Sequence, residues 1–436
     1  MKWSKYNFLF KSEKYGYLLF NSQSNTFAEL DEKTYNEIEK IRKNPDNYDY
    51  NENFGLYIQL LTGKILLEDH ENPLIDMKFQ IDLTKYSSSI LYLTIAPTTE
   101  CNFNCPYCFE ESRKPVHMSE ETENNIIKFI KKMNTGLYKI TWYGGEPLLG
   151  WNNIQSLTKK FRENNLKFTA SMVSNGYAFD AEKVSKLKEY NIKNIQITLD
   201  GLEQTHNKKR PLLNGDNTFK KILENIHLIL EKAECYLSIR VNIDKSNIDE
   251  YHELHGFLME KFSKFKSRFN VYPGIVLNLE QSCSNSSSCL LDKSGVSNFM
   301  ISAYKNHNIK DLQFFPDVIF QACTANALYR YVVGPDGELY KCWHHIGNPE
   351  MVVGNVDEEK MSLNTQLIAK FITGTEPFTD EKCVNCFFLP LCNGGCPHLV
   401  YLNRFENKKF DLCSVFKSNI KEFLEIYYEI KNSQIN

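Results

Sequence analysis

Short apolar runs alternate with amphipathic stretches through the middle of the chain. Runs rich in β-branched and aromatic residues predict strands, and the stretches between them, whose apolar residues recur three and four positions apart, predict helices. The predicted strands are residues 91–96, 139–143, 168–173, 194–199, 237–243 and 269–279, and the clearest predicted helices are 119–133 and 218–232. This alternation indicates an α/β domain of parallel strands, folded as a β/α barrel or partial barrel.

The N-terminal eighty residues follow a different pattern. Three β-rich runs, 6–10, 15–21 and 26–30, are separated by turn residues and precede two helical stretches, 32–42 and 54–66. Gly63 interrupts the second stretch. Three strands followed by helices predict a small winged-helix module. Its sheet would leave an edge to which an extended peptide can add a strand, although a module of this kind can also serve only as a cap on the barrel.

The composition agrees with a large soluble enzyme. It has 436 residues, of which 42% are hydrophobic and 24% charged, and this suffices for two or three domains. The net charge of −3 gives no general attraction to nucleic acid or anionic lipid. Lys11, Glu13 and Lys14 interrupt the first twenty residues, so we expect no signal peptide. No other run approaches the roughly 20 apolar residues of a membrane span, and we expect a cytoplasmic location. Thirteen cysteines in such a compartment point to metal or redox chemistry.

Three of these cysteines, Cys101, Cys105 and Cys108, follow directly after the first predicted strand. Four thiolates would complete a [4Fe-4S] cluster, so three leave one iron open to a small molecule. A structural zinc site is the alternative, but zinc usually requires a fourth ligand at short range, and none follows before His117. The loop therefore predicts an iron–sulfur centre that carries chemistry.

The Cys-x3-Cys-x2-Cys spacing, with an aromatic residue before the last cysteine, resembles the signature of radical S-adenosylmethionine (SAM) enzymes. In that family the amino and carboxylate groups of SAM chelate the open iron. An electron from the cluster then breaks the sulfonium bond, and the resulting 5′-deoxyadenosyl radical takes a hydrogen atom from the substrate. The resemblance implies that the three cysteines form the catalytic centre, with SAM as cofactor, in a partial (β/α)6 TIM-like barrel over residues 85–310.

Polar and glycine motifs recur where the predicted strands end, the edge at which barrels carry their working residues. The sequence Gly-Gly-Glu-Pro begins at Gly144, about 36 residues after Cys108, and matches the family's motif for the SAM amino group. Polar residues after the next two strands suit a ribose and a methionine tail, and two further residues align more loosely. The positions that the resemblance assigns to SAM are Gly144, Gly145, Glu146, Pro147, Ser174, Asn175, Asp200, Arg210 and Asn242. For Arg210 the alternative is a surface residue beside Pro211.

Seven more cysteines fall in the last quarter of the chain: Cys323, Cys342, Cys383, Cys386, Cys392, Cys396 and Cys413. Their order resembles the SPASM domain that many peptide-modifying radical SAM enzymes carry, here over residues 311–436. A zinc ribbon would account for only four of the seven.

The SPASM resemblance implies two auxiliary [4Fe-4S] clusters, and so three clusters in all. It assigns Cys383, Cys386, Cys392 and Cys413 to an outer cluster. It assigns Cys323, Cys342 and Cys396 to an inner one. The inner cluster then lacks a ligand, for which Cys283, Cys289, another protein group or the substrate are candidates.

The module over residues 1–80 resembles the recognition element that binds leader peptides in the maturation of ribosomally synthesised peptides (RiPPs). Together these resemblances imply a peptide maturase that forms thioethers in a Cys-containing precursor, with flavodoxin or ferredoxin as electron donor. One alternative is an anaerobic sulfatase-maturing enzyme, but such enzymes place an Asp where this chain has Trp343. Carbon–carbon or carbon–oxygen crosslinking is another. A non-catalytic electron-transfer protein would leave the three-cysteine loop unexplained.

Overall fold

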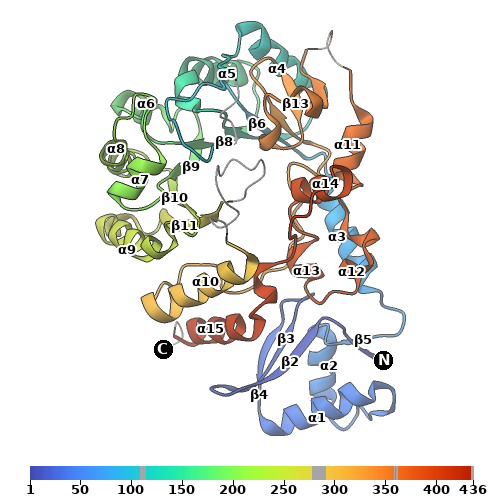
Figure 1. Ribbon diagram of the computed structural model, residues 1–436. Helices are drawn as coiled ribbons and strands as arrows, with labels where there is room; N and C mark the ends of the chain where they lie inside the picture. Colours follow the sequence, from blue (N-terminus) through green and yellow to red (C-terminus); the bar gives the residue numbers. More distant parts are fainter. Residues whose placement is uncertain (109–113, 277–290, 358, 360–361, 434–436) are drawn as a thin grey trace. The chain divides into compact units, whose positions relative to one another are not determined.

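The computed structural model describes residues 1–108, 114–276, 291–357, 359 and 362–433 (Figure 1). Contacts divide the chain into two compact units. The first unit comprises Met1–Lys85, Lys293–Ala322 and Thr373–Asn436, and the second comprises Tyr86–Asp292 and Cys323–Ile372. Each unit therefore contains segments that are far apart in the sequence.

A nine-stranded sheet forms the centre of the second unit, in the order β11-β10-β9-β8-β7-β6-β12-β13-β14. Six strands run parallel in chain order: β6 (Ile90–Ile95), β7 (Leu137–Trp142), β8 (Phe168–Ser174), β9 (Ile192–Thr198), β10 (Tyr236–Ile243) and β11 (Phe269–Ile275). This confirms the predicted α/β fold with a parallel sheet. The predicted strands agree to within two residues at their described ends, and residues 277–279 of the last one lie outside the described residues.

Three later strands extend this sheet beyond β6. β12 (Arg330–Val333) pairs with β6 in parallel, whereas β13 (Glu338–Tyr340) and β14 (Gly354–Asn355) add antiparallel neighbours. Helices of this unit connect and cover the strands, and Figure 1 shows α5, α6, α8 and α9 along the outer side of the parallel array. The helices are α4 (Glu120–Met133), α5 (Trp151–Glu163), α6 (Ala181–Lys186), α7 (Glu203–Lys209), α8 (Phe219–Lys232), α9 (Tyr251–Lys261) and α11 (Thr365–Ile372).

Alternation along β10 separates the core from the inner face of the sheet. Leu237, Ile239, Val241 and Ile243 are fully buried, while Arg240 and Asn242 between them are only partly buried. Successive side chains on a strand point to opposite faces, so the apolar set packs under the helices and the polar set lines the other face. The parallel sheet thus presents polar side chains on the side away from its helices.

The sequence of α4 explains where this covering helix begins and ends and which of its residues are buried. The Ser119 side chain caps its first turn by accepting a hydrogen bond from the Thr122 N–H, and acidic residues occupy that turn. Asn134 adopts a left-handed conformation at the other end. Ile126 and Ile130, one turn apart, are fully buried. The predicted helix over 119–133 is therefore confirmed.

The first unit contains a three-stranded antiparallel sheet, β2 (Asn7–Ser12), β3 (Gly16–Asn21) and β4 (Phe27–Leu30), with β3 in the middle. It is followed by α1 (Glu32–Lys43) and α2 (Phe54–Thr62). Leu19 of the sheet packs with Ile38, Ile41 and Leu60 of the two helices in one apolar cluster. The three strands and two helices predicted here are present.

The second predicted helix, 54–66, was too long. Helix α2 ends at Thr62, Lys64 takes a left-handed conformation, and Leu66–Leu67 form strand β5, which pairs with β1 (Lys2–Trp3). Gly63 disfavours continuation of the helix, and Leu66 is completely buried as part of that strand.

Later segments of the chain complete this unit. They supply α10 (Lys293–His307), α12 (Glu381–Val384), α13 (Leu389–Cys392), α14 (Pro397–Phe405) and α15 (Ile420–Ser433), while α3 (Pro73–Lys85) follows β5. The Phe20 ring packs against Phe315 and Phe387, and the Ser22 hydroxyl donates to the Phe387 carbonyl. The small sheet therefore rests on residues from the C-terminal part of the sequence. Within the described residues, none of the helices has the length and apolarity that a membrane crossing requires.

Candidate functional site

The three cysteines of the first motif lie on the loop that leaves β6. All three are partly buried thiols. Burial, together with smaller contributions from Glu146, Cys105 and Cys108, raises the pKa of the Cys101 thiol to about 12. Thiols on such a loop require a cationic partner to become thiolates at neutral pH, and a metal centre provides one.

The glycines after β7 pack directly on the backbone of the cysteine loop. A Cβ atom at Gly144, where φ is +119°, would lie 2.3 Å from the Thr98 carbonyl oxygen, and one at Gly145 would lie 2.3 Å from that of Glu100. The Glu146 N–H donates to the same Glu100 oxygen at 2.8 Å. Only glycine permits this close approach, so the two motifs form one structural piece.

Glu146 is completely buried, and its carboxylate is held by three donors. It accepts hydrogen bonds from the Leu148 N–H at 3.0 Å, the Ser174 hydroxyl at 2.8 Å and the Asn175 N–H at 2.6 Å. Burial raises the pKa of Glu146, although these bonds and the charge of Arg210 oppose the rise. Three predicted SAM-binding residues, Glu146, Ser174 and Asn175, are therefore in direct contact.

The other three polar positions gather around Tyr107, the aromatic residue before Cys108. Its hydroxyl accepts from Arg210 Nη1 at 2.7 Å and from Asn242 Nδ2 at 3.3 Å, and donates to the Asp200 carboxylate. Arg210 also pairs with Asp200 at 3.6 Å. Arg210 is thus not the surface residue that its place beside Pro211 would allow. Tyr107 is not among the residues that the sequence assigned to SAM. The one signal for it in the sequence is its position directly before Cys108.

Two more residues that the sequence does not single out hold Asp200 in place. His206 Nδ1 accepts the Asp200 N–H at 3.1 Å, and its Nε2 lies 3.1 Å from the Thr218 hydroxyl. Burial lowers the pKa of His206 well below its usual value, so the ring is neutral. The Asn247 amide donates to the Asp200 and Asn242 carbonyls at 2.8 and 2.9 Å. Because both side chains bond to the Asp200 backbone, their role is to position that residue.

The side chains around Glu146 and those around Asp200 both bond to the cysteine loop. In the first set, Asn175 Nδ2 donates to Asn102 Oδ1 at 2.8 Å. The second set bonds to the hydroxyl of Tyr107, which is part of the loop. No three His, Cys, Asp or Glu side chains of the described part of the chain converge as single-ion ligands would. Ligands of a [4Fe-4S] cluster bind separate irons and need not converge in this way. The thiols of the loop are suitable ligands for such a cluster. The adjacent glycines leave room for a small ligand, and the fixed Glu146 carboxylate can pair with the amino group of a ligand that resembles an amino acid.

The sequence profile of the radical SAM superfamily matches residues 95–258, which contain the three cysteines and every predicted SAM-binding residue. This chain carries a radical SAM domain. It is accordingly a radical SAM enzyme, and members of the superfamily bind a [4Fe-4S] cluster and SAM.

Relatives of this radical SAM enzyme include proteins that match most of its length. The chain is 22% identical to the radical SAM cyclopropyl synthase TigE of Paramaledivibacter caminithermalis, over 97% of this chain and 95% of TigE. It is 24% identical to the cysteine-type anaerobic sulfatase-maturating enzyme of Clostridium novyi, over 77% of this chain and 94% of that one. Streptococcus suis SuiB, solved with its precursor peptide SuiA, superposes with a TM-score of 0.52 at 16% identity, over 95% and 99% of the two chains, which shows a shared fold.

Beyond the radical SAM domain, four of the seven C-terminal cysteines are neighbours. Burial, together with smaller contributions from Cys386, Cys383 and Cys413, raises the pKa of the Cys392 thiol to about 11. These four are the set predicted for the outer cluster, and all lie in the first unit.

The set predicted for the inner cluster is distributed over both units. Cys323 and Cys342 belong to the second unit, and Cys396 belongs to the first. Cys283 and Cys289, the candidates for its missing ligand, lie outside the described residues. Its composition therefore stays a prediction.

Trp343 follows Cys342 and stacks on Tyr143, the residue that precedes Gly144. Their ring centroids are 5.4 Å apart with an interplanar angle of 17°, and Trp343 is 42% exposed. An aromatic pair thus connects the Gly-Gly-Glu-Pro motif with the segment that carries Cys342.

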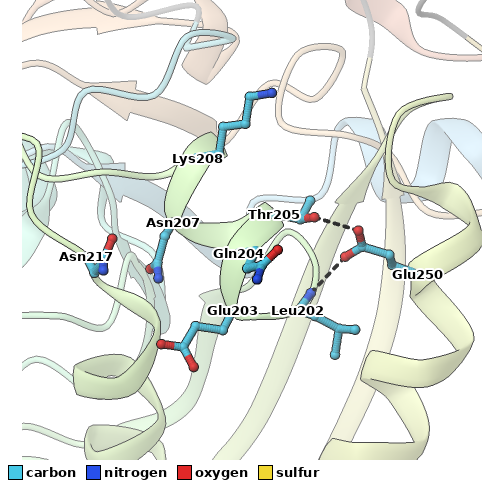
Figure 2. Close-up of a pocket in the computed structure, with 8 residues that line it drawn as sticks. All are labelled: Leu202, Glu203, Gln204, Thr205, Asn207, Lys208, Asn217 and Glu250. Atoms are coloured by element: carbon cyan, nitrogen blue, oxygen red, sulfur yellow. Dashed lines mark hydrogen bonds between the residues drawn. The ribbon is translucent and has the colours of Figure 1, made fainter.

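A cavity of about 870 Å³ opens beside α7 (Figure 2). Its lining includes Lys208 and Glu250, and Glu250 accepts hydrogen bonds from the Leu202 N–H at 3.1 Å and the Thr205 hydroxyl at 2.5 Å. None of the predicted SAM-binding residues lines it. This cavity is therefore separate from the site that the motifs form.

Tyr107→Phe is expected to weaken SAM binding by roughly 10- to 100-fold, because the change leaves buried Asp200 and Arg210 without their shared hydroxyl. Equilibrium binding of SAM to the reconstituted protein measures the effect. Tyr138→Phe is the matched control, since it removes a buried hydroxyl bond to the Thr135 carbonyl outside the site. Equal SAM affinity in the two variants would contradict this role of Tyr107.

Proposed function

We propose that this enzyme matures a ribosomally made, Cys-containing precursor peptide by forming thioether crosslinks. The observation that carries the proposal is the set of seven cysteines that follows the radical SAM domain, four of which are neighbours. These cysteines would hold two auxiliary clusters, giving three clusters in all. The protein would comprise a leader-binding winged-helix module over 1–80, the barrel over 85–310 and a SPASM domain over 311–436. The fold shared with SuiB, solved with a precursor peptide, supports a peptide substrate.

The residues of the site would bind and orient SAM. Glu146, held by three donors, is placed to pair with the SAM amino group. The group around Tyr107 supplies Arg210 and Asn242 for the carboxylate and ribose. When bound, the cluster and SAM supply the carbon radical that takes hydrogen from the peptide; the protein contributes position and electrostatics.

Thioether formation balances as a two-electron oxidation of the peptide. One C–H and one S–H bond break and one C–S bond forms. One hydrogen atom would leave with SAM as 5′-deoxyadenosine, the thiol proton would go to solvent, and the remaining electron would pass to an auxiliary cluster held by the C-terminal cysteines. A cytoplasmic flavodoxin or ferredoxin would supply the electron that cleaves SAM. In this proposal the cysteine-rich C-terminal part of the chain would accept that electron.

Carbon–carbon bond formation is the second candidate. TigE, which is named a cyclopropyl synthase, aligns with 97% of this chain. This similarity supports formation of a carbon–carbon bond as the alternative reaction. The likeness to a cysteine-type anaerobic sulfatase-maturating enzyme supports sulfatase maturation as a further reaction. The family resemblance, which expects an Asp where this chain has Trp343, opposes it.

High-resolution mass analysis distinguishes these reactions. The short Cys-containing peptide encoded beside the gene is incubated anaerobically with reconstituted enzyme, SAM and a strong reductant, and its thiols are then titrated. A thioether requires loss of two hydrogens and of one titratable thiol. Loss of two hydrogens with every thiol retained would indicate carbon–carbon bonding. SAM cleavage with an unchanged peptide would refute this substrate.

Removing the leader from the precursor is expected to slow its modification by roughly 100-fold, because a tethered core peptide gains effective concentration from leader docking. SAM cleavage without peptide stays unchanged. Truncating the enzyme at residue 80 is a poorer test, because it would uncover Phe315 and Phe387, on which Phe20 packs.

Rates of crosslink formation for full and leaderless peptides give the measurement. A precursor with a scrambled leader of the same composition is the control, and it should behave like the leaderless peptide. If the leaderless and full precursors react at one rate, the module over residues 1–80 does not dock the leader.

A further inference from the structure

Arg240 is a partly buried cation on the polar face of the parallel sheet, two positions before Asn242 on β10. Its Nε donates to Asn242 Oδ1 at 2.8 Å. A guanidinium also carries N–H groups on both Nη atoms, and this bond leaves them available. Within the part of the chain that the structure describes, Arg240 forms no ion pair with a carboxylate. The charge of this side chain is therefore not balanced by a described neighbour.

Gly274 on β11 makes room for this side chain. Asn242 lies opposite Gly274 in the strand register, whereas Arg240 lies opposite Tyr272. A Cβ atom at Gly274 would lie 2.3 Å from Arg240 Nε and 2.9 Å from its Nη2. The guanidinium thus leans toward the C-terminal end of the strands and fills the space that a side chain at position 274 would take. Parallel barrels carry their reacting groups at this end.

The groups that surround the guanidinium on this face are neutral. The Tyr272 hydroxyl donates to Gln196 Oε1 at 2.5 Å. Burial raises the pKa of Tyr272, and the charge of Arg240 opposes that rise, so the phenol keeps its proton. Proteins usually pair a charge that is partly removed from water. A carboxylate is the anion that suits a guanidinium, because two parallel N–H groups can bind both of its oxygens.

This position lies beside the residues assigned to SAM. Glu146, Asn175 and Asp200 follow β7, β8 and β9, whereas the Arg240 guanidinium packs over Gly274 of β11, the last strand of the sheet. Asn242 lies between the two positions, since its amide bonds both to Arg240 and to the Tyr107 hydroxyl. A molecule that pairs with Arg240 would therefore lie next to SAM at the same end of the sheet. The substrate of the radical has to lie in such a place.

We propose that Arg240 binds a carboxylate of the peptide substrate and so selects precursors with an acidic group close to the reacting cysteine. The carboxylate belongs to an Asp or Glu side chain or to the C-terminus of the peptide. The inference rests on the proposed function, which makes a peptide the substrate. Arg240 is thus a specificity-determining residue, and Gly274 is the position that allows its guanidinium to reach the end of the sheet.

Equilibrium binding of the precursor tests this pairing. The short Cys-containing peptide encoded beside the gene carries a fluorescent label, and its anisotropy is measured anaerobically with the full-length reconstituted enzyme and saturating SAM, without reductant. Arg240→Gln is expected to weaken binding by roughly 10- to 100-fold, because the carboxylate loses its charged partner. Arg240→Lys keeps the charge but not the fork of N–H groups, so it should weaken binding less.

Two amidated peptides identify the carboxylate. In one, Asn and Gln replace every Asp and Glu that follows the leader, and in the other the C-terminus is an amide. The peptide that lacks the bound carboxylate should bind the unaltered enzyme as weakly as the native peptide binds Arg240→Gln, and that variant should weaken it no further. An effect that acts through Asn242 and SAM would weaken native and amidated peptides equally, and this result would overturn the proposal.

Gly274→Ala tests the position of the guanidinium while it keeps the charge. The added carbon meets only the flexible end of Arg240, so thermal unfolding should change little while affinity for the native peptide falls. This variant also tests the pairing if Arg240→Gln yields no folded protein. Gly256→Ala on α9 is the matched control, because its added Cβ has no atom within 4 Å, and it should bind the peptide normally.

Unchanged affinity for the native peptide in Arg240→Gln, or in Gly274→Ala, contradicts the proposal. So does a peptide that loses no affinity when all of its carboxylates beyond the leader are amidated. A precursor that binds in the expected way but is not crosslinked argues against thioether formation and leaves the carboxylate pairing in place. The binding and crosslinking measurements therefore separate this inference from the proposed function.

Discussion

Replacing Cys101, Cys105 and Cys108 together by alanine is expected to abolish SAM cleavage, by at least roughly 1,000-fold, since the reductive step has no route without the cluster. Iron and sulfide bound by the C-terminal cysteines should remain. The loop carries three partly buried thiols, and no other described segment of the radical SAM domain offers such a set. Chromatography of 5′-deoxyadenosine after incubation with dithionite measures the loss, and chemical assay measures the remaining iron.

Cys235→Ala serves as the control for this triple variant. Cys235 is a free, buried thiol of the same domain that lies outside the cysteine pattern, so its loss should leave SAM cleavage in place. Turnover of SAM that survives in the triple variant would remove the assignment of the loop. Loss of all bound iron in that variant would instead contradict the auxiliary clusters.

Gly145→Ala is expected to reduce SAM cleavage by roughly 100-fold and to destabilise the fold by about 1–3 kcal/mol, the usual cost of forcing an extra carbon into a packed site. The new Cβ atom would lie 2.3 Å from the Glu100 carbonyl oxygen and 2.5 Å from that of Thr99. Both are backbone atoms of the segment that leads into Cys101, so relief of the clash displaces the cysteine loop. Formation of 5′-deoxyadenosine and thermal unfolding report the two effects.

Gly136→Ala provides the matched control, because no atom lies within 4 Å of the Cβ that it would add. Gly136 directly precedes β7 and Gly145 is the third residue after it, so both changes flank one strand of the parallel sheet. The control should cleave SAM at the normal rate. A Gly145→Ala protein that matches it in both assays would show that the motif does not need its close approach to the loop.

The sequence alone predicted those site residues that belong to short motifs. The cysteine spacing, the Gly-Gly-Glu-Pro motif and Asp200 at a strand end are all visible within short windows, and the structure brings them together. Tyr107 and His206 were missed because their roles depend on folding: the Tyr107 hydroxyl bonds to partners 93 and 103 residues away. A phenol beside a cysteine has no local feature that reveals such partners.

Boundaries in the N-terminal part were harder to predict for a related reason. The apolar residues of 54–66 continue a helical pattern past Gly63, yet Leu66 pairs with Trp3, more than sixty residues earlier. Helix α3 has buried Met77 and Ile81 but also exposed Ile75 and Phe79, so no single apolar stripe marks it. Contacts between residues far apart in the sequence determine where these elements begin and end. Such contacts cannot be identified from a single sequence.

The chain passes between its two compact units four times, at Lys85, Asp292, Ala322 and Ile372. No single cut therefore releases either unit intact. During synthesis the first 85 residues leave the ribosome long before 373–436, the segment that contains Phe387, on which Phe20 packs. Domains usually fold as they emerge, but this unit stays incomplete until residues 373–436 have been synthesised. A premature stop near residue 372 would thus leave an apolar face of the N-terminal sheet exposed. We expect such fragments to bind chaperones and to be degraded by proteases.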